Sequence, residues 1–253
     1  GRKVLLEIDF GGEAQARIDG VEVGAFSSNM NEGWVHRDQI LISKSAGAGG
    51  RFSLELECTI NSGGYCDVFL AGEDKTTYTM AKGRLVAIDE VAESYHFDVT
   101  TAFHGMECIR DKTIKALVFK AIDASLDCLD FDFDRERFSE SIPGAQEQLN
   151  TLLASIPHAP PAKVIMTGHS HIDTAWLWTV RESVRKCGRT FSNVTALMDW
   201  HEETVFAQSQ AALYDFTKTH FPKVYRRIRD RVQDRKWEVV GNVWVEADTN
   251  IPT

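Results

Sequence analysis

The sequence has no long hydrophobic run and no excess of positive charge. No stretch approaches the roughly 20 apolar residues that a transmembrane helix needs, and the N-terminus has no basic region followed by an apolar run. We therefore expect no contact with a membrane. The formal net charge is −9. Because nucleic-acid binding relies on clustered Lys and Arg, we also expect no nucleic-acid partner.

Cysteine is present, but without the spacing of a zinc or redox motif. The five cysteines are odd in number, widely spread, and form no CxxC pair. Free thiols in a reducing compartment are the expected state, so the sequence predicts a cytoplasmic protein. Cys58 and Cys66 flank a Gly-rich turn and could pair across a hairpin, an alternative that stays open.

Residues 1–105 have the patterns of short β-strands. In "ARIDGVEV", the pair Asp19-Gly20 suits a two-residue type I′ hairpin, because both positions require positive φ. Apolar and polar residues alternate in "RFSLELECTI" (51–60). Further strands are expected at "CDVFLAG", "TTYTMA", "RLVAIDE" and "SYHFDVT". Short strands separated by turns predict an N-terminal antiparallel β-sandwich or jelly-roll-like domain.

The pattern changes to that of helices near residue 111. Apolar residues recur at helical spacing over 111–132, and a second helix fits 139–156, with Pro143 in its first turn. The following segment "PHAPPAK" (157–163) holds three of the six prolines, which makes it a stiff connector. We therefore predict a helical connector and Pro-rich linker over 106–160.

Strand and helix patterns alternate over 161–253. Strands are expected at "KVIMTGHS", "TVFAQSQ" and "WEVVGNVWVEAD", with helices over 174–198, at "QAALYDFTKTH" and at "PKVYRRIRDRVQDR". This alternation predicts a parallel sheet or an α/β barrel, although about three strands cannot close one. In the basic run 223–236, apolar residues recur every four positions, which indicates an amphipathic helix with a solvated basic face.

The segment "GHSHIDTAWLW" (168–178) carries the strongest chemical signal. It lies where a predicted strand ends, and ligands of α/β folds gather at the carboxyl ends of strands. His169, His171 and Asp173 share one side of an extended segment because side chains alternate with period two. Imidazole nitrogens and carboxylate oxygens are zinc ligands. Metal-dependent amidohydrolases and phosphoesterases also place an HxH after a barrel strand, so that class stays open.

Four segments in order resemble the opening of the catalytic domain of glycoside hydrolase family 38, the class II α-mannosidases. They are "GHSHIDTAWLW", "RTFSNVTALM", "VFAQSQAALYDF" and "KWEVVGNVWVEADTNIP". The likeness is closest to the cytosolic and bacterial branch and covers roughly 163–253. It implies a multidomain β plus α/β fold, in which 161–253 begins an incomplete α/β barrel of the (β/α)7 type.

The resemblance also implies roles for individual residues. His171 and Asp173 match the zinc ligands of the family, with one zinc ion in each complete site, whereas His169 supports without ligating. Trp176 matches the aromatic wall of the sugar subsite, and a flat apolar ring suits the C–H face of a pyranose. Glu246 and Asp248 resemble residues that line the sugar site.

The activity implied is retaining, zinc-dependent hydrolysis of terminal α-D-mannosides of oligosaccharides. The family's nucleophile, its acid/base and the remaining zinc ligands would follow Thr253, so we expect no catalytic residue in this chain and no activity from it alone. Two alternatives stay open. One is an amidohydrolase-like hydrolase that uses the HxH motif. The other is a carbohydrate-binding role for the N-terminal domain, with Trp34, Tyr65 and Tyr78 as the sugar platform. A homo-oligomer is compatible with the sequence.

Overall fold

The chain divides into two compact units. The structure, a computed structural model, describes residues 2–9, 12–27, 37–59, 80–132, 134–157, 163–176, 178–241 and 243–246. Contacts group 1–87 with 165–253 in one unit and place 88–164 in the other. The domain boundaries expected at 105 and 160 stay a prediction, since these units follow contacts rather than chain order.

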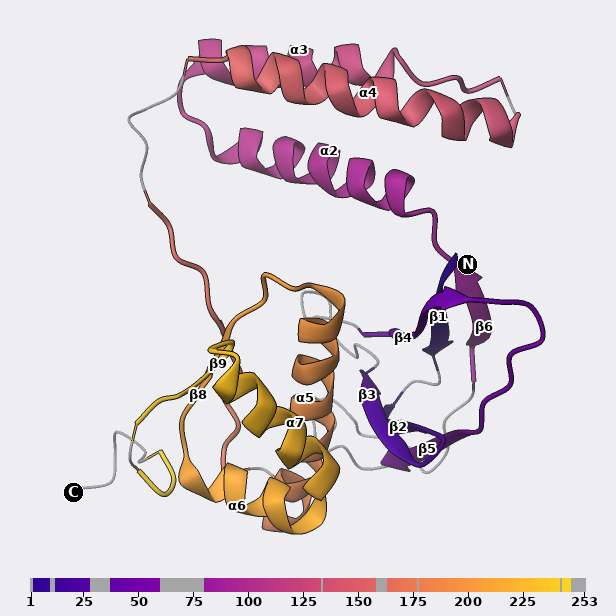
Figure 1. The fold of residues 1–253 in the computed structure, drawn as a ribbon. Coiled ribbons are helices and arrows are strands. Elements are labelled where there is room, and N and C mark those ends of the chain that lie inside the picture. The colour runs from indigo at the N-terminus through magenta and orange to yellow at the C-terminus, as the bar shows by residue number, and fades with distance from the viewer. Residues whose placement is uncertain are drawn as a thin grey trace, which may run out of the picture. The chain divides into compact units, whose positions relative to one another are not determined.

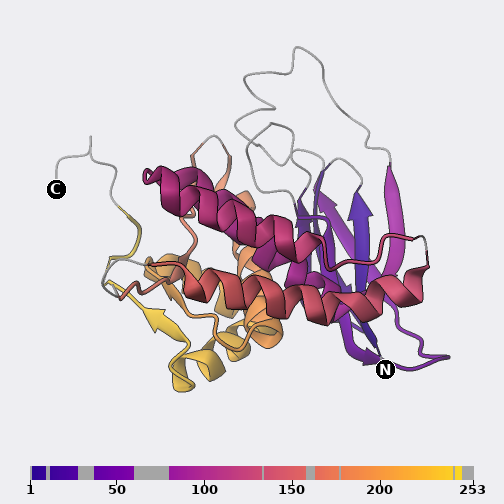
Figure 2. The ribbon, with the colours of Figure 1, turned by 90° about the horizontal axis from the view of Figure 1, so that it is seen from above.

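The N-terminal part of the first unit contains two antiparallel sheets of three strands (Figures 1 and 2). The strands are β1 (Arg2–Asp9), β2 (Glu13–Ile18), β3 (Val21–Ser27), β4 (Gln39–Ala46), β5 (Leu54–Thr59) and β6 (Lys82–Ala87). One sheet has the order β4-β1-β6 and the other β3-β2-β5. Both contribute to one buried core, formed by Leu6, Ile8, Ala14, Ala16, Phe26 and Ile40. The predicted antiparallel β architecture is confirmed. The strands expected at "CDVFLAG" and "TTYTMA" lie almost wholly outside the described residues.

The hairpin between β2 and β3 forms at the predicted dipeptide. Ile18 pairs with Val21, which leaves Asp19 and Gly20 as the two turn residues. Their φ angles are 50° and 74°, the left-handed values that a type I′ turn requires. The Asp19 carboxylate also accepts a hydrogen bond from the backbone N–H of Ser53, at 2.8 Å. This hydrogen bond holds the turn against Ser53, the residue directly before β5.

Three helices make up the second unit: α2 (Glu90–Cys108), α3 (Lys112–Leu126) and α4 (Arg135–Ser155). The strand expected at "SYHFDVT" is wrong, because these residues lie in the middle of α2. The residues of α2 that face the core of this unit are Ala92, Tyr95, Val99, Ala102 and Met106. Their spacing of three and four is helical, and it outweighs the strand propensity of the aromatic and β-branched residues.

The start of α4 also differs from the prediction. The helix begins at Arg135, where the side chain of Asp134 caps it by accepting the N–H of Glu136. Pro143 therefore lies inside the helix rather than in its first turn.

Among the helices that the structure describes, none is long and apolar enough to cross a bilayer.

The C-terminal part of the first unit alternates strand and helix. Its elements are β7 (Gly168–His169), α5 (Val180–Trp200), β8 (Phe206–Gln208), α6 (Ala211–His220), α7 (Pro222–Gln233) and β9 (Trp237–Val239). The strands pair in parallel in the order β7-β8-β9. The mixed β and α architecture and the parallel sheet are confirmed, while the start of a barrel stays a prediction.

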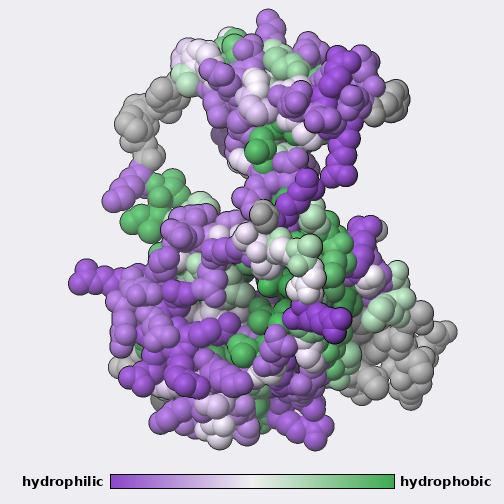
Figure 3. Space-filling view, turned by 45° about the vertical axis from the view of Figure 1, so that its right-hand side comes forward, coloured by the Kyte–Doolittle hydropathy of each residue, from purple (hydrophilic) through white to green (hydrophobic). Residues whose placement is uncertain are grey.

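The elements of this parallel sheet are shorter than expected. Only the last part of "KVIMTGHS" pairs with β8, and Val164, Ile165 and Met166 are exposed, with 77%, 77% and 82% of their surface accessible. Hydrophobic residues, green in Figure 3, are visible at the surface in several places. The helix expected from residue 174 begins at Val180, so Asp173 and Trp176 lie in a loop.

Helix α5 packs against β3, where the Asn193 side chain lies close to Gly24. A Cβ atom placed there would lie 2.8 Å from Oδ1 of Asn193 and 3.2 Å from Cγ2 of Ile40. The same Oδ1 atom accepts the backbone N–H of Ala25, at 2.7 Å. A side chain at this position would displace the Asn193 amide, which would break its hydrogen bond to Ala25 and loosen the packing of α5 on β3.

We expect Gly24→Ala to destabilise the protein by about 1–3 kcal/mol, the usual cost of overpacking. Thermal unfolding followed by circular dichroism would show a lower Tm. Gly47→Ala is the matched control, since a Cβ at Gly47 meets nothing within 4 Å. Equal Tm values for the two variants would contradict the close approach of α5 to β3.

Candidate metal centre

The carboxyl ends of β7, β8 and β9 meet at one edge of the parallel sheet. His169 ends β7, with His171 two residues later, and Ser209 directly follows β8. Glu246 lies on the segment after β9. Since parallel strands place their carboxyl ends at the same edge, segments distant in sequence converge there.

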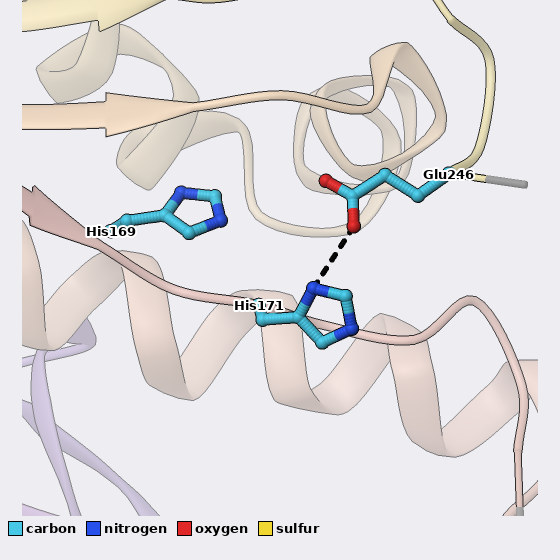
Figure 4. A group of neighbouring side chains, drawn as sticks. All are labelled: His169, His171 and Glu246. Atoms are coloured by element: carbon cyan, nitrogen blue, oxygen red, sulfur yellow. Dashed lines mark ion pairs between the residues drawn. The ribbon is translucent and has the colours of Figure 1, made fainter. Parts of the chain in front are cut away.

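Three of these side chains point toward one another (Figure 4). One potential ligand atom each from His169, His171 and Glu246 lies within 4.8 Å of the others. Nδ1 of His169 is 2.9 Å from the carbonyl oxygen of Ala207. A carbonyl only accepts hydrogen bonds, so in the neutral ring Nδ1 carries the proton and Nε2 offers a lone pair.

His171 lies between two carboxylates. Its Nδ1 is 2.9 Å from Oε2 of Glu246, and its Nε2 is 3.0 Å from Oδ1 of Asp173. Both oxygens are acceptors, but a neutral imidazole has only one N–H, so one of the two contacts needs an additional proton or a cation. Imidazole nitrogens and carboxylate oxygens are ligands that a divalent ion such as zinc accepts. The possible ligands that lie together are His169, His171 and Glu246, whereas Asp173 approaches the other nitrogen of His171. This donor set fits the metal that the sequence implied.

The second oxygen of Glu246 and the end of β8 are held by polar contacts. The Ser209 hydroxyl donates a hydrogen bond to Oε1 of Glu246. The Tyr214 hydroxyl donates to the carbonyl of Gln208 and accepts from Nε1 of Trp237, each at 2.9 Å. Burial raises the pKa of Tyr214 to about 12, so this hydroxyl remains a donor at neutral pH.

Trp176, the predicted sugar wall, is exposed at the surface of the loop. The residue is 54% exposed, and its indole lies edge-to-face against that of Trp178, with the ring centroids 5.6 Å apart. The predicted residues His171, Asp173 and Glu246 lie together, and His169 lies beside them. Asp248 lies outside the described residues, as do Trp34, Tyr65 and Tyr78.

The sequence interpretation missed three polar residues around this site: Ser183, Ser209 and Gln210. Ser209 and Gln210 follow directly on β8, and polar residues at the end of a predicted strand were a usable signal. Ser183 had no such signal, because a serine in an amphipathic helix is unremarkable until its contacts are known.

A cavity of about 420 Å³ lies near this edge of the sheet, between α6, α7 and β9. It is lined by Gln210, Ala211, Tyr214, Tyr225, Ile228, Arg229, Val232, Gln233, Val239, Val240 and Gly241. None of the clustered histidines and carboxylates lines it. The chemistry of the site therefore lies outside this cavity, on a surface open to solvent, where 61% of the His171 side chain is accessible.

Known proteins match the segment that carries these residues. A family model described as the glycosyl hydrolases family 38 N-terminal domain matches residues 161–253. Residues 161–253 are thus similar to glycosyl hydrolase family 38. This confirms the family resemblance for the part of the chain that contains the HxHxD motif.

The chain also has curated relatives. Alpha-mannosidase G of Dictyostelium discoideum is 40% identical over 91 residues, which is 36% of this chain and 8% of the relative. Alpha-mannosidase 2C1 of Homo sapiens is 37% identical over 114 residues, 45% of this chain and 11% of the relative. The alpha-mannosidase of Saccharomyces cerevisiae is 39% identical over 87 residues, 34% of this chain and 8% of the relative. The matched part thus spans about a tenth of each relative.

Proposed function

We propose that this chain supplies the N-terminal part of a zinc-dependent α-mannosidase that acts on terminal α-mannosides of glycans. The observation that carries the proposal is the meeting of His171 with Asp173 and Glu246 at the end of a parallel sheet, within a segment of family 38. The family match covers the HxH motif itself. It therefore favours a mannosidase over the amidohydrolase-like alternative.

The residues of this chain would bind and orient. His171 and Asp173 would hold the metal, and His169 would support them through its contact with Ala207. Glu246 would either complete the ligand set or line the sugar site. The exposed indole of Trp176 would receive the apolar face of a mannose ring. When bound, zinc would orient the sugar hydroxyls and stabilise developing charge.

Retaining glycosidases need two further carboxyl groups, about 5–5.5 Å apart, as nucleophile and acid/base. The resemblance places both in family segments that have no counterpart among residues 1–253. We therefore propose that the 253-residue chain is inactive by itself.

Zinc affinity tests the metal site directly. We expect the purified chain to bind Zn²⁺ weakly in calorimetric titration, because few ligands hold the ion. His171→Ala should lower the association constant at least tenfold. The matched control is His201→Ala, which removes another half-exposed histidine that contacts a carboxylate, that of Glu203. Equal zinc affinity in the two variants would contradict the assignment of His171 as a zinc ligand.

A chimera tests the activity. We expect Alpha-mannosidase G to keep hydrolysing an aryl α-mannoside when its matching 91 residues are replaced by those of this chain. In that chimera Asp173→Asn should lower kcat/KM at least about 100-fold, because a direct metal ligand is lost. Asp215→Asn, which changes an exposed carboxylate on α6, should have little effect. A folded chimera without activity, or one indifferent to Asp173→Asn, would contradict the proposed function.

A further inference from the structure

The backbone on both sides of Asp173 is held by two buried polar side chains. Ser183 belongs to the first turns of α5, and Gln210 directly precedes α6. Their residues are 0% and 2% exposed. Neither lies in the group of possible metal ligands, so their contacts are with the chain that presents those ligands.

The Ser183 hydroxyl uses its full hydrogen-bonding capacity on this loop. It donates to the carbonyl oxygen of Asp173 at 3.1 Å. It accepts from the backbone N–H of Ala175 and from Nε1 of Trp178, each at 3.0 Å. A hydroxyl has one donor and two acceptor sites, so no capacity is left for water.

Gln210 holds the other side of the same segment. Its Nε2 donates to the carbonyl of Ile172 at 3.0 Å, and its Oε1 accepts from the Thr174 hydroxyl at 3.2 Å. The start of α6 is tied in turn to the segment that carries Glu246. The N–H of Ala211 donates to the carbonyl of Val243 at 3.0 Å.

Two residues in this arrangement adopt left-handed backbone conformations that are unfavourable outside glycine. Ala175 has φ 69° and Gln210 has φ 64°. Such conformations cost of order 1–3 kcal/mol and persist where surrounding contacts determine them. At Ala175 the contact is the hydrogen bond to Ser183, and at Gln210 it is the pair of bonds made by the side chain. The loop is therefore fixed at an energetic cost.

We propose that Ser183 and Gln210 are positioning residues, which fix the backbone of 172–175 so that His171 and Asp173 face the metal before it binds. The inference rests on the proposed zinc site. Removing the outer partners of metal ligands typically lowers metal affinity 10- to 100-fold. A loop that is ordered in advance avoids the entropic cost of ordering when zinc arrives.

The test uses Ser183→Ala in the 253-residue chain, with Ser192→Ala as the matched control. Ser192 is also fully buried on α5, where it accepts from Gln15 and donates to the carbonyl of Arg189, each at 3.1 Å. It makes no contact with the loop in these bonds. Two quantities are measured in each variant: amide hydrogen exchange of residues 172–178 without metal, and the affinity for Zn²⁺.

We expect Ser183→Ala to lose protection at Ala175 and to bind Zn²⁺ at least tenfold more weakly, while Ser192→Ala keeps both. A purely structural role would lower the Tm of both variants without separating their zinc affinities. If Ser183→Ala does not fold, Gln210→Asn serves instead, since asparagine tolerates positive φ but is too short to make both bonds.

Three outcomes would count against the proposals, and they are distinguishable. Unchanged exchange at 172–178 would overturn the inference whatever the zinc result. Lost protection with unchanged zinc affinity would overturn the positioning role. A wild-type chain that is protected at 172–178 but binds no Zn²⁺ would overturn the zinc site of the proposed function, and with it the role of these residues toward a metal.

Discussion

The contact between helix α5 and the N-terminal β-strands is the constraint on which the first unit depends. Arg189, on α5, has a side chain only 8% exposed and contacts the carboxylates of Glu13 on β2 and Glu182 on α5, at 2.6 and 2.5 Å. A buried guanidinium would be very costly alone, and its carboxylate partners offset that cost. Glu182 immediately precedes Ser183, which bonds to the backbone of Asp173 and Ala175. The contacts that anchor α5 to the sheet therefore adjoin those that hold the loop of Asp173.

The basic helix α7 strengthens the same attachment. Val224 and Ile228 are buried, as expected for an amphipathic helix. Two of the basic side chains, however, are not simply solvated: Lys223 donates to the carbonyl of Gly20 and Arg227 to that of Glu22, each at 2.6 Å. These bonds tie α7 to the β2–β3 hairpin. Part of the positive charge of this run therefore has a structural role.

The candidate metal centre lies at the carboxyl edge of the parallel sheet. A local motif supplies His169, His171 and Asp173, and a segment far along the chain supplies Glu246. The match to family 38 covers all four of these residues. Only about a tenth of each curated relative is matched by this chain.

The sequence by itself determined the features that depend on neighbouring residues. The Asp19-Gly20 hairpin, the amphipathic helices and the HxHxD motif at a strand end follow from turn chemistry and side-chain periodicity. The strand propensity of "SYHFDVT" led to a wrong prediction, because the core-facing residues there have helical spacing. Only the tertiary structure decided the late start of α5, the approach of Glu246 to His171, and the contacts of Ser183 and Gln210 with the loop. These depend on strand pairing and helix packing, which bring together residues that no local pattern relates.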